Sequence, residues 1–323
     1  MRRRTLLCGA VAATFSGSRA SARAQGFPSK VIRILVPFSA GSGTDVVARL
    51  LARELGPRLG QNILVENQTG AGGNMATASL ARAEPDGHTL LLTTTAHAIA
   101  PNLQKSLPFD AVADFAPVTL VCSGPLVLTA NPAFAAKTVG DLIALAKAKP
   151  GTINYASSGT GTTPHLAVEL LKIKAGIDLV HVPYRGGNPA MVDVLANVVP
   201  LYFASPATAM PMVESGQVRA LGLSSAERPS FIRDIPTIAE QGVPGYRVDF
   251  WYGLLAPAKT PRSTVDRLQR ETAEILRKPE VIAQLHKLGF DPTATTPEAF
   301  GGLIRDEIAL WAEVTRTAKI SLE

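Results

Sequence analysis

Cysteine is scarce in this sequence, and its scarcity excludes several kinds of site. The 323 residues include two cysteines, Cys8 and Cys122, and contain no Cys-x-x-Cys pair. The five histidines do not have the spacing of metal ligands either. A zinc or iron–sulfur centre is therefore not predicted, and we expect no metal and no other cofactor. Cys122 is expected to be a small buried apolar side chain rather than a nucleophile.

Complete catalytic and nucleotide-binding motifs are also missing. The stretch Ser157-Ser158-Gly159 lacks the flanking glycines of a nucleophile elbow, and no lysine follows a glycine-rich loop as in a P-loop. One alternative stays open, a dinucleotide site at Gly41-Ser42-Gly43, because Glu66 ends the next predicted strand where a ribose-binding acid would stand. Against it, Val46 occupies the position of the third glycine. The sequence favours a binding protein over an enzyme.

Long apolar runs are missing after the first residues of the chain. Residues 1–24 combine a run of arginines, a short apolar stretch from Thr5 to Phe15 and small residues at Ala22 and Ala24. This pattern is typical of a secretory signal peptide that is cleaved near Ala24. No later stretch is long enough for a transmembrane helix, so we expect an exported, soluble protein.

The arginines of residues 1–24 also account for most of the excess basic charge. The whole sequence has 32 Lys and Arg against 26 Asp and Glu, and five of the arginines lie in this segment, which has no acid. Residues 25–323 contain the other 27 of the 32 basic residues and all 26 acidic residues, so their net charge is about +1. A basic surface for nucleic acid is therefore not predicted.

Two loops of small polar residues stand between predicted strands and helices. In the first, a β-branched run at 31–36 leads into residues 37–45 and then into apolar residues at helical spacing. In the second, a strand at 153–156 leads into residues 157–164 and another helix. Such loops present backbone N–H groups at a helix start, where an anion can bind. Together they predict one small anion held by both loops.

Strands alternate with helices along the whole chain, which predicts an α/β fold. About 300 residues after the signal segment favour two domains. Extended segments near 115–129 and 248–256 are predicted to cross between them. We therefore expect one lobe formed by residues 25–125 plus 251–323 and a second lobe formed by residues 126–250. Each lobe is expected to contain an open, mainly parallel sheet flanked by helices.

A series of short motifs supports a more specific prediction. They occur in order along the chain: Val36-Pro37-Phe38, Gly41-x-Gly43-Thr44-Asp45, Val65-Glu66-Asn67, Gly70-Ala71-Gly72-Gly73, Pro85-Asp86-Gly87, Tyr155-Ala156-Ser157-Ser158-Gly159, His181-Val182-Pro183-Tyr184-Arg185-Gly186, Pro244-Gly245-Tyr246 and Trp251-Tyr252-Gly253. From about residue 28 to the C-terminus, the sequence resembles the Bug-type substrate-binding proteins of tripartite tricarboxylate transporters.

The resemblance implies a fold, a function and partners. The fold would be a two-lobed periplasmic binding protein, a type II-like Venus flytrap that closes on its ligand. Its function would be to capture a small carboxylate, a di- or tricarboxylate or an aromatic monocarboxylate, for uptake by a tripartite tricarboxylate-type transporter or for sensing. The implied partners are the ligand and either the membrane subunits of the transporter or a sensor protein. A monomer is expected.

The resemblance also implies ligand contacts, carried over position by position. In the first lobe they are Ser39, Ala40, Gly41, Ser42, Thr44 and Asp45. In the second lobe they are Ser158, Gly159, Thr160, Gly161, Thr162 and Thr163. Further candidates are His97, Ser205 and Trp251. Three of these have an alternative role: Asp45 as a complement to the positive helix start, His97 in loop packing and Trp251 in hinge packing.

One departure from the family pattern bears on the ligand. Many members carry an acidic residue at the end of the strand that is Leu201-Tyr202-Phe203-Ala204 in this chain. Such an acid can receive a ligand amine, whereas Ala204 and Ser205 stand there in this sequence. The departure argues against amino-acid ligands.

Overall fold

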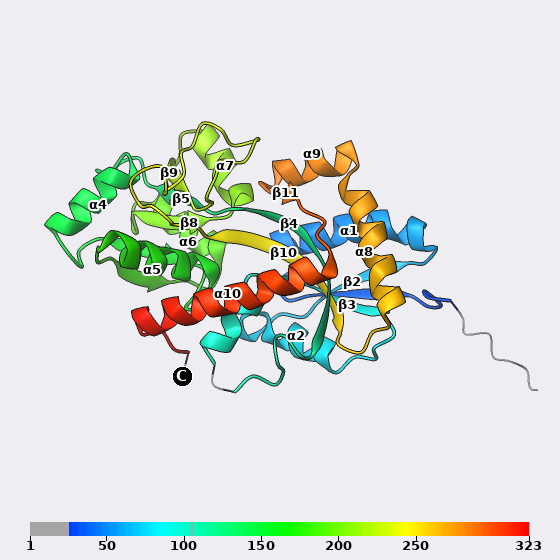
Figure 1. Cartoon of the computed structure of the whole chain (residues 1–323). Coiled ribbons are helices and arrows are strands. Elements are labelled where there is room, and N and C mark those ends of the chain that lie inside the picture. Colours follow the sequence, from blue (N-terminus) through cyan, green and yellow to red (C-terminus); the bar gives the residue numbers. More distant parts are fainter. Residues whose placement is uncertain (1–25, 105, 323) are drawn as a thin grey trace, which may run out of the picture.

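The computed structural model describes residues 26–104 and 106–322, which form two β-sheets covered by helices (Figure 1). The predicted signal peptide, residues 1–24, lies outside the described residues. Within the described residues, no helix is long and apolar enough to cross a membrane.

The first sheet has six strands in the order β11-β4-β10-β3-β1-β2. β1 pairs in parallel with β2 and β3, whereas β10 pairs antiparallel with β3 and β4, and β11 antiparallel with β4. The strands are β1 (Ile32–Val36), β2 (Ile63–Asn67), β3 (Thr89–Thr94), β4 (Phe115–Pro125), β10 (Asp249–Pro257) and β11 (Asp291–Pro292).

The second sheet has five strands in the order β7-β6-β8-β5-β9. β6 pairs in parallel with β7 and β8, and β5 pairs antiparallel with β8 and β9. The strands are β5 (Val127–Ala130), β6 (Asn154–Ser157), β7 (Val180–Pro183), β8 (Leu201–Ala204) and β9 (Arg219–Leu223).

Both sheets are mixed, which corrects the expectation of mainly parallel sheets. Parallel neighbours need a helical crossover on their own sheet. The chain instead enters the second sheet directly from β4 into β5, and returns to the first sheet through β10. The two strands that arrive from the other half of the molecule, β5 and β10, both pair antiparallel with their neighbours. The expected two-lobed α/β architecture itself is confirmed by the two sheets.

Helices cover both sheets and link them (Figure 1). α10 packs on β4 and α3 of the first half and on α5 of the second, so it contacts elements of both halves. The helices are α1 (Gly43–Leu59), α2 (Asn74–Ala81), α3 (Ala96–Ile99), α4 (Val139–Ala148), α5 (Thr163–Ala175), α6 (Gly187–Leu195), α7 (Pro206–Glu214), α8 (Arg262–Leu276), α9 (Pro279–Lys287) and α10 (Pro297–Ala318), with 3-10 turns η1 (Ala71–Gly73) and η2 (Ala100–Asn102).

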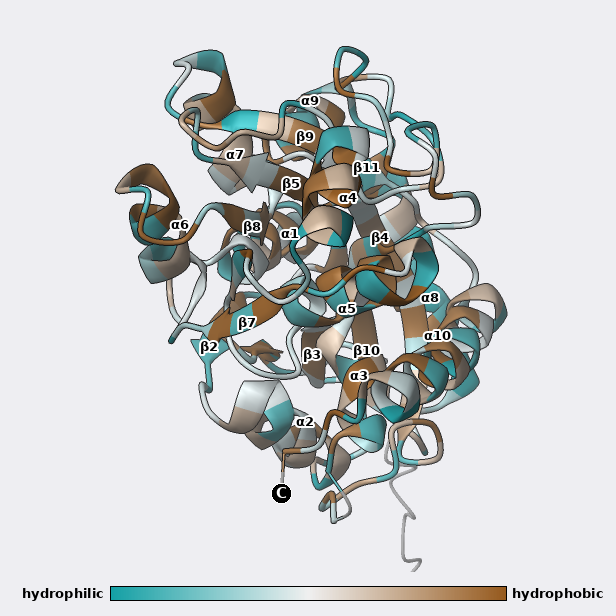
Figure 2. Cartoon of the chain, turned by 90° about the vertical axis from the view of Figure 1, so that its left-hand side faces the viewer, coloured by the Kyte–Doolittle hydropathy of each residue, from teal (hydrophilic) through white to brown (hydrophobic). Residues whose placement is uncertain are grey.

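The interior is apolar, as the strand sequences require. All six residues of β3 are buried, as expected for a strand covered on both faces. Figure 2 shows the same distribution: β3, β5 and β10 are largely hydrophobic, whereas the helices carry hydrophilic residues on their outer faces. One apolar core includes residues of both sheets and α10, among them Trp251 and Trp311. The core therefore continues from one half of the molecule to the other.

Candidate functional site

The first candidate loop, residues 37–42, joins β1 to α1 and is held in place by Asp45. Ser42 caps α1, with its Oγ accepting the N–H of Asp45 at 3.3 Å. The Asp45 carboxylate accepts the Gly41 N–H and the Arg49 Nε–H, both at 2.9 Å. Asn67 at the end of β2 donates to the same carboxylate at 3.0 Å. Asp45 is 2% exposed, so its acceptor sites are occupied inside the protein.

Asp45 is ionised in this environment. Burial alone raises the pKa of the Asp45 carboxyl, but its three hydrogen bonds and the charge of Arg49 outweigh burial and hold the pKa below its usual value. The arrangement matches the alternative role for Asp45, a charge that complements the helix start. Whether Asp45 also contacts a ligand stays a prediction.

The second candidate loop, residues 158–162, joins β6 to α5. Ser157 is fully buried, and its Oγ accepts the Gly159 N–H at 3.1 Å and contacts Nε2 of His181 at 2.7 Å. Nδ1 of His165 accepts the Gly161 N–H at 3.0 Å. The side chains that support this loop are therefore neutral, whereas a carboxylate supports the first loop.

The two loops have similar backbones from residues 40–46 and 160–166, but they differ one residue earlier, where Gly159 has φ +137° and Ser39 has no positive φ. Gly41 and Gly161 have φ values of +80° and +77°. The N–H of Ser42 donates to Ser39 O at 3.1 Å, and that of Thr162 donates to Gly159 O at 3.2 Å. The first helical turn also closes alike, from residue 46 to residue 42 at 2.9 Å and from 166 to 162 at 3.1 Å. Two glycine-containing loops with different sequences thus present the same backbone shape.

The backbone N–H groups left over in each loop suit an anion. Within the described chain, the N–H groups of Ala40 and Gly43 have no partner, and the same holds for the equivalent Thr160 and Thr163. Free N–H groups at a helix start carry partial positive charge and bind anions. The structure therefore gives two similar turns with free N–H groups, one in each half of the molecule, and anion binding by them stays a prediction.

A buried tyrosine supports each turn. Tyr252 of β10 approaches Thr44, and a Cβ on Gly43 would lie 2.5 Å from its hydroxyl oxygen. In the other half, Tyr202 of β8 approaches Ser158. Glycine at position 43 lets the tyrosine approach the helix start. Neither tyrosine was among the predicted ligand contacts, because the strand pattern alone marks them as core residues.

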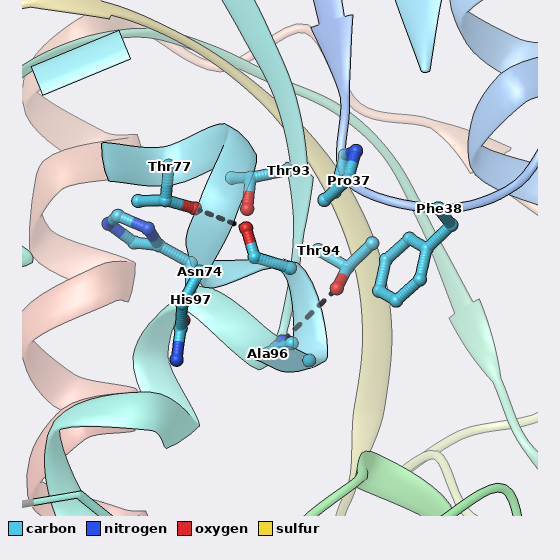
Figure 3. A pocket seen from close by; sticks show the side chains of 10 residues that line it. Pro37, Phe38, Asn74, Thr77, Thr93, Thr94, Ala96 and His97 are labelled. Carbon is cyan, nitrogen blue, oxygen red and sulfur yellow. Dashed lines mark hydrogen bonds between the residues drawn. The ribbon is translucent and has the colours of Figure 1, made fainter. Parts of the chain in front are cut away.

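A small pocket lies beside the first loop, at the carboxyl ends of β1 and β3 (Figure 3). Its volume is about 10 Å³, which is about the size of a single water-sized sphere. His97 lines it, is 4% exposed, and contacts Ala111 O through Nε2 at 2.8 Å. Burial lowers the pKa of His97 to about 4, so the ring is neutral. The pocket residues are Pro37, Phe38, Gly72, Gly73, Asn74, Thr77, Thr93, Thr94, Ala96 and His97.

Sequence reasoning missed the threonines that line this pocket. In Figure 3, Thr77 and Thr94 turn their hydroxyls toward the backbone at Gly73 and Ala96, to which they are hydrogen-bonded at 3.1 and 3.2 Å. They come from α2 and β3, whose loops were recognised only as polar turns after strands. The rule that ligands bind beyond the carboxyl ends of strands was the signal that could have found them.

Two further candidates lie apart from the two turns. Trp251 is 1% exposed and packs edge-on against Phe300 of α10, with ring centroids 5.4 Å apart. Ser205 stands at the start of α7, where its Oγ contacts the Thr208 hydroxyl at 3.1 Å. The position of Trp251 agrees with hinge packing. A ligand contact by either residue stays a prediction.

Metal and nucleotide chemistry find no support in the described residues. Among residues 26–104 and 106–322, no group of three His, Cys, Asp or Glu side chains could hold a metal ion. Glu66, the acid of the dinucleotide alternative, lies 3.7 Å from Arg33 on the neighbouring strand. Burial raises the pKa of the Cys122 thiol, which makes it a poor nucleophile.

A two-sheet α/β molecule with a similar helix-start turn in each half is typical of two-lobed solute-binding proteins. Comparison with known proteins agrees. Residues 47–320 match the tripartite tricarboxylate transporter family receptor model. BugT of Bordetella pertussis is 35% identical over 310 residues, 95% of each chain.

Two solved structures are similar over almost their whole length. Rpa4515 of R. palustris, solved with adipate, has a TM-score of 0.84 at 32% identity and covers 91% of this chain and 99% of its own. MatC from Rhodopseudomonas palustris, solved with bound malate, has a TM-score of 0.79 at 32% identity and covers 89% and 99%. The chain belongs to the tripartite tricarboxylate transporter receptor family, whose members are periplasmic solute-binding proteins. The prediction of a binding protein is confirmed, and the dinucleotide alternative is not favoured.

Proposed function

We propose that this protein captures a small carboxylate between its two anion-binding turns. The observation that carries the proposal is the shared backbone shape of residues 40–46 and 160–166, each with free N–H groups at a helix start. A carboxylate has two oxygens that accept such N–H groups. Closure of the halves on the ligand gains contacts only if both turns engage it.

The proposal extends to the lobes and the leader. We assign residues 25–125 plus 251–323 to one lobe and residues 126–250 to the other, because the chain enters the second sheet after Leu126 and returns to the first sheet in β10. Residues 1–24 are removed on export to the periplasm. The loaded monomer then meets the membrane subunits of a tripartite tricarboxylate-type transporter, or a sensor protein.

The proposed ligands are di- or tricarboxylates or aromatic monocarboxylates. Relatives solved with adipate and malate support carboxylates as the ligand class. At the end of β8, Ala204 and Ser205 offer no carboxylate to a ligand amine. We therefore expect amino acids to bind weakly or not at all.

A thermal-shift screen of the protein without residues 1–24 tests this proposal. Mono-, di- and tricarboxylates and amino acids would be compared at equal concentrations. A ligand at a thousandfold excess over its Kd stabilises the folded protein by about 4 kcal/mol, which raises the unfolding temperature measurably. No stabilisation by any carboxylate would contradict the proposal, and so would sustained conversion of a bound carboxylate by the pure protein.

Loop variants test whether both turns take part. Gly41→Val forces a β-branched side chain into φ +80°, and Gly159→Pro is incompatible with φ +137°. We expect each to weaken carboxylate binding by about 1–3 kcal/mol in calorimetric titrations. Gly60→Val is the matched control, because Gly60 has φ +69° at the far end of α1. If a folded Gly41 or Gly159 variant binds like wild type, that turn does not hold the ligand.

A further inference from the structure

The second turn depends on a histidine where the first depends on a carboxylate. His165 occupies the position that corresponds to Asp45, and its Nδ1 accepts the Gly161 N–H at 3.0 Å. An N–H group can only donate, so Nδ1 carries no proton and the ring is the neutral Nε2–H tautomer. His165 therefore fixes the Gly161 amide as Asp45 fixes the Gly41 amide.

The surroundings of His165 hold this ring in one orientation. It is 4% exposed and stacks on His181, with ring centroids 3.8 Å apart and planes 12° from parallel. The Tyr155 ring stacks on both histidines, at 6.3 Å from His165 and 5.1 Å from His181. His181 in turn reaches the loop through its 2.7 Å contact with Ser157. Burial, together with the charges of neighbouring groups, lowers the pKa of His165 to about 3.

The charges next to the two turns explain why the acceptors differ. Asp45 has Arg49 one helical turn later, at 2.9 Å, which balances its charge. Glu169 stands at the equivalent place after His165, and it is bound to the Tyr155 hydroxyl at 2.6 Å and to Lys172 at 2.9 Å. A carboxylate at position 165 would have no cation of its own. A neutral acceptor there leaves the positive potential of the helix start available to an anion.

We propose that His165 is a positioning residue of the ligand site. As a neutral acceptor, His165 keeps the Gly161 N–H in a hydrogen bond inside the protein. This bond fixes the turn so that the N–H groups of Thr160 and Thr163 stay directed at the bound anion. This inference rests on the proposed function, carboxylate binding by the second turn.

Three substitutions at position 165 separate the acceptor, the ring and the charge. His165→Phe keeps a stacked ring but removes the acceptor, and should weaken binding of the best carboxylate about tenfold. His165→Asn keeps a neutral side-chain acceptor for the Gly161 N–H and should restore affinity to within about threefold of wild type. His165→Asp keeps an acceptor but adds an unbalanced negative charge, so it should bind the anion more weakly than His165→Asn.

Tyr155→Phe is the matched control. It removes the buried hydroxyl bond to Glu169 within the same stacked cluster but leaves the loop acceptors in place. We expect Tyr155→Phe to lower stability and to leave the Kd unchanged. The proposal is overturned if His165→Phe binds like wild type, if His165→Asn is as weak as His165→Phe, or if Tyr155→Phe weakens binding as much as His165→Phe does.

A measurement on the wild-type protein tests the geometry without any substitution or ligand. Nitrogen-15 NMR of the His165 ring should show an unprotonated, hydrogen-bonded Nδ1 between pH 6 and pH 8, and the Gly161 amide should exchange more slowly than the Thr160 amide. A protonated Nδ1 would refute the proposal. If the wild-type protein binds no carboxylate, the proposed function fails, and this measurement still decides whether His165 holds Gly161.

Discussion

Removal of the Asp45 carboxylate tests how the first turn keeps its shape. In Asp45→Ala, the Gly41 N–H and one N–H of Asn67 lose their acceptor. Arg49 is 55% exposed, so water can replace its half of the ion pair at little cost. Gly41 is also exposed, so its N–H can reach water. The bonds from Asn67 and Gly41 to a charged acceptor, with the Gly41 bond discounted because its N–H reaches water, then amount to about 2–4 kcal/mol of unfolding free energy. For a chain of roughly 300 residues this corresponds to a fall in Tm of roughly 3–6 °C.

The control for this prediction is another Arg–Asp pair one helical turn apart. Arg262 and Asp266 lie 2.7 Å from each other, but their side chains are 65% and 50% exposed. Asp266→Ala should therefore cost less than about 1 kcal/mol. Thermal unfolding of both variants by circular dichroism makes the comparison. If Asp45→Ala is no less stable than Asp266→Ala, the carboxylate does not anchor the turn.

Carboxylate affinity gives a second, independent reading of Asp45→Ala. If Asp45 serves to hold the turn, its loss disorders the N–H groups of residues 40 and 43, and the Kd rises. If Asp45 instead faces the ligand, its loss removes a like charge, and the Kd falls. Calorimetric titration of the variant at neutral pH distinguishes the two signs. Tighter binding would refute the structural role argued above.

Three further predictions concern packing and pH. A Cβ on Gly253 would lie 2.0 Å from the Phe300 ring. Gly253→Ala should therefore lower the free energy of unfolding in urea by about 1–3 kcal/mol. An unchanged free energy would show that the ring can move aside. Burial raises the pKa of Glu307 to about 7, above the unfolded value of about 4.3. The protonated Glu307 side chain therefore contributes stability that is full below about pH 4.3 and is lost as the pH rises through 7. Glu307→Gln should become more stable relative to wild type between pH 5 and pH 8.5. A stability difference that does not change with pH would contradict this. Burial lowers the pKa of His97 to about 4 and that of His165 to about 3, below the unfolded value of about 6.5. Below pH 6.5 the unfolded chain binds protons that the folded chain does not, so wild-type stability should fall from pH 6.5 toward pH 4, which urea titrations at each pH would measure.

The amino-acid sequence by itself determined the local features of the candidate site. A β-branched run followed by small residues and a helical pattern defines the strand, loop and helix at residues 31–59 because these preferences act over a few neighbouring residues. The same reasoning located the second loop and the helix after it. Ordered motifs then identified the family, since each motif is local and can be read without knowing what packs against it.

The tertiary structure alone decided which residues act together. Asn67 donates to Asp45, Tyr252 supports Thr44 and Tyr202 supports Ser158, and each pair joins segments that are distant in sequence. Strand pairing was also decided there, because the direction in which a strand enters a sheet depends on how the two halves connect. The equivalence of Asp45 and His165 likewise became visible only in the backbone, because two chemically different side chains accept the same amide hydrogen there.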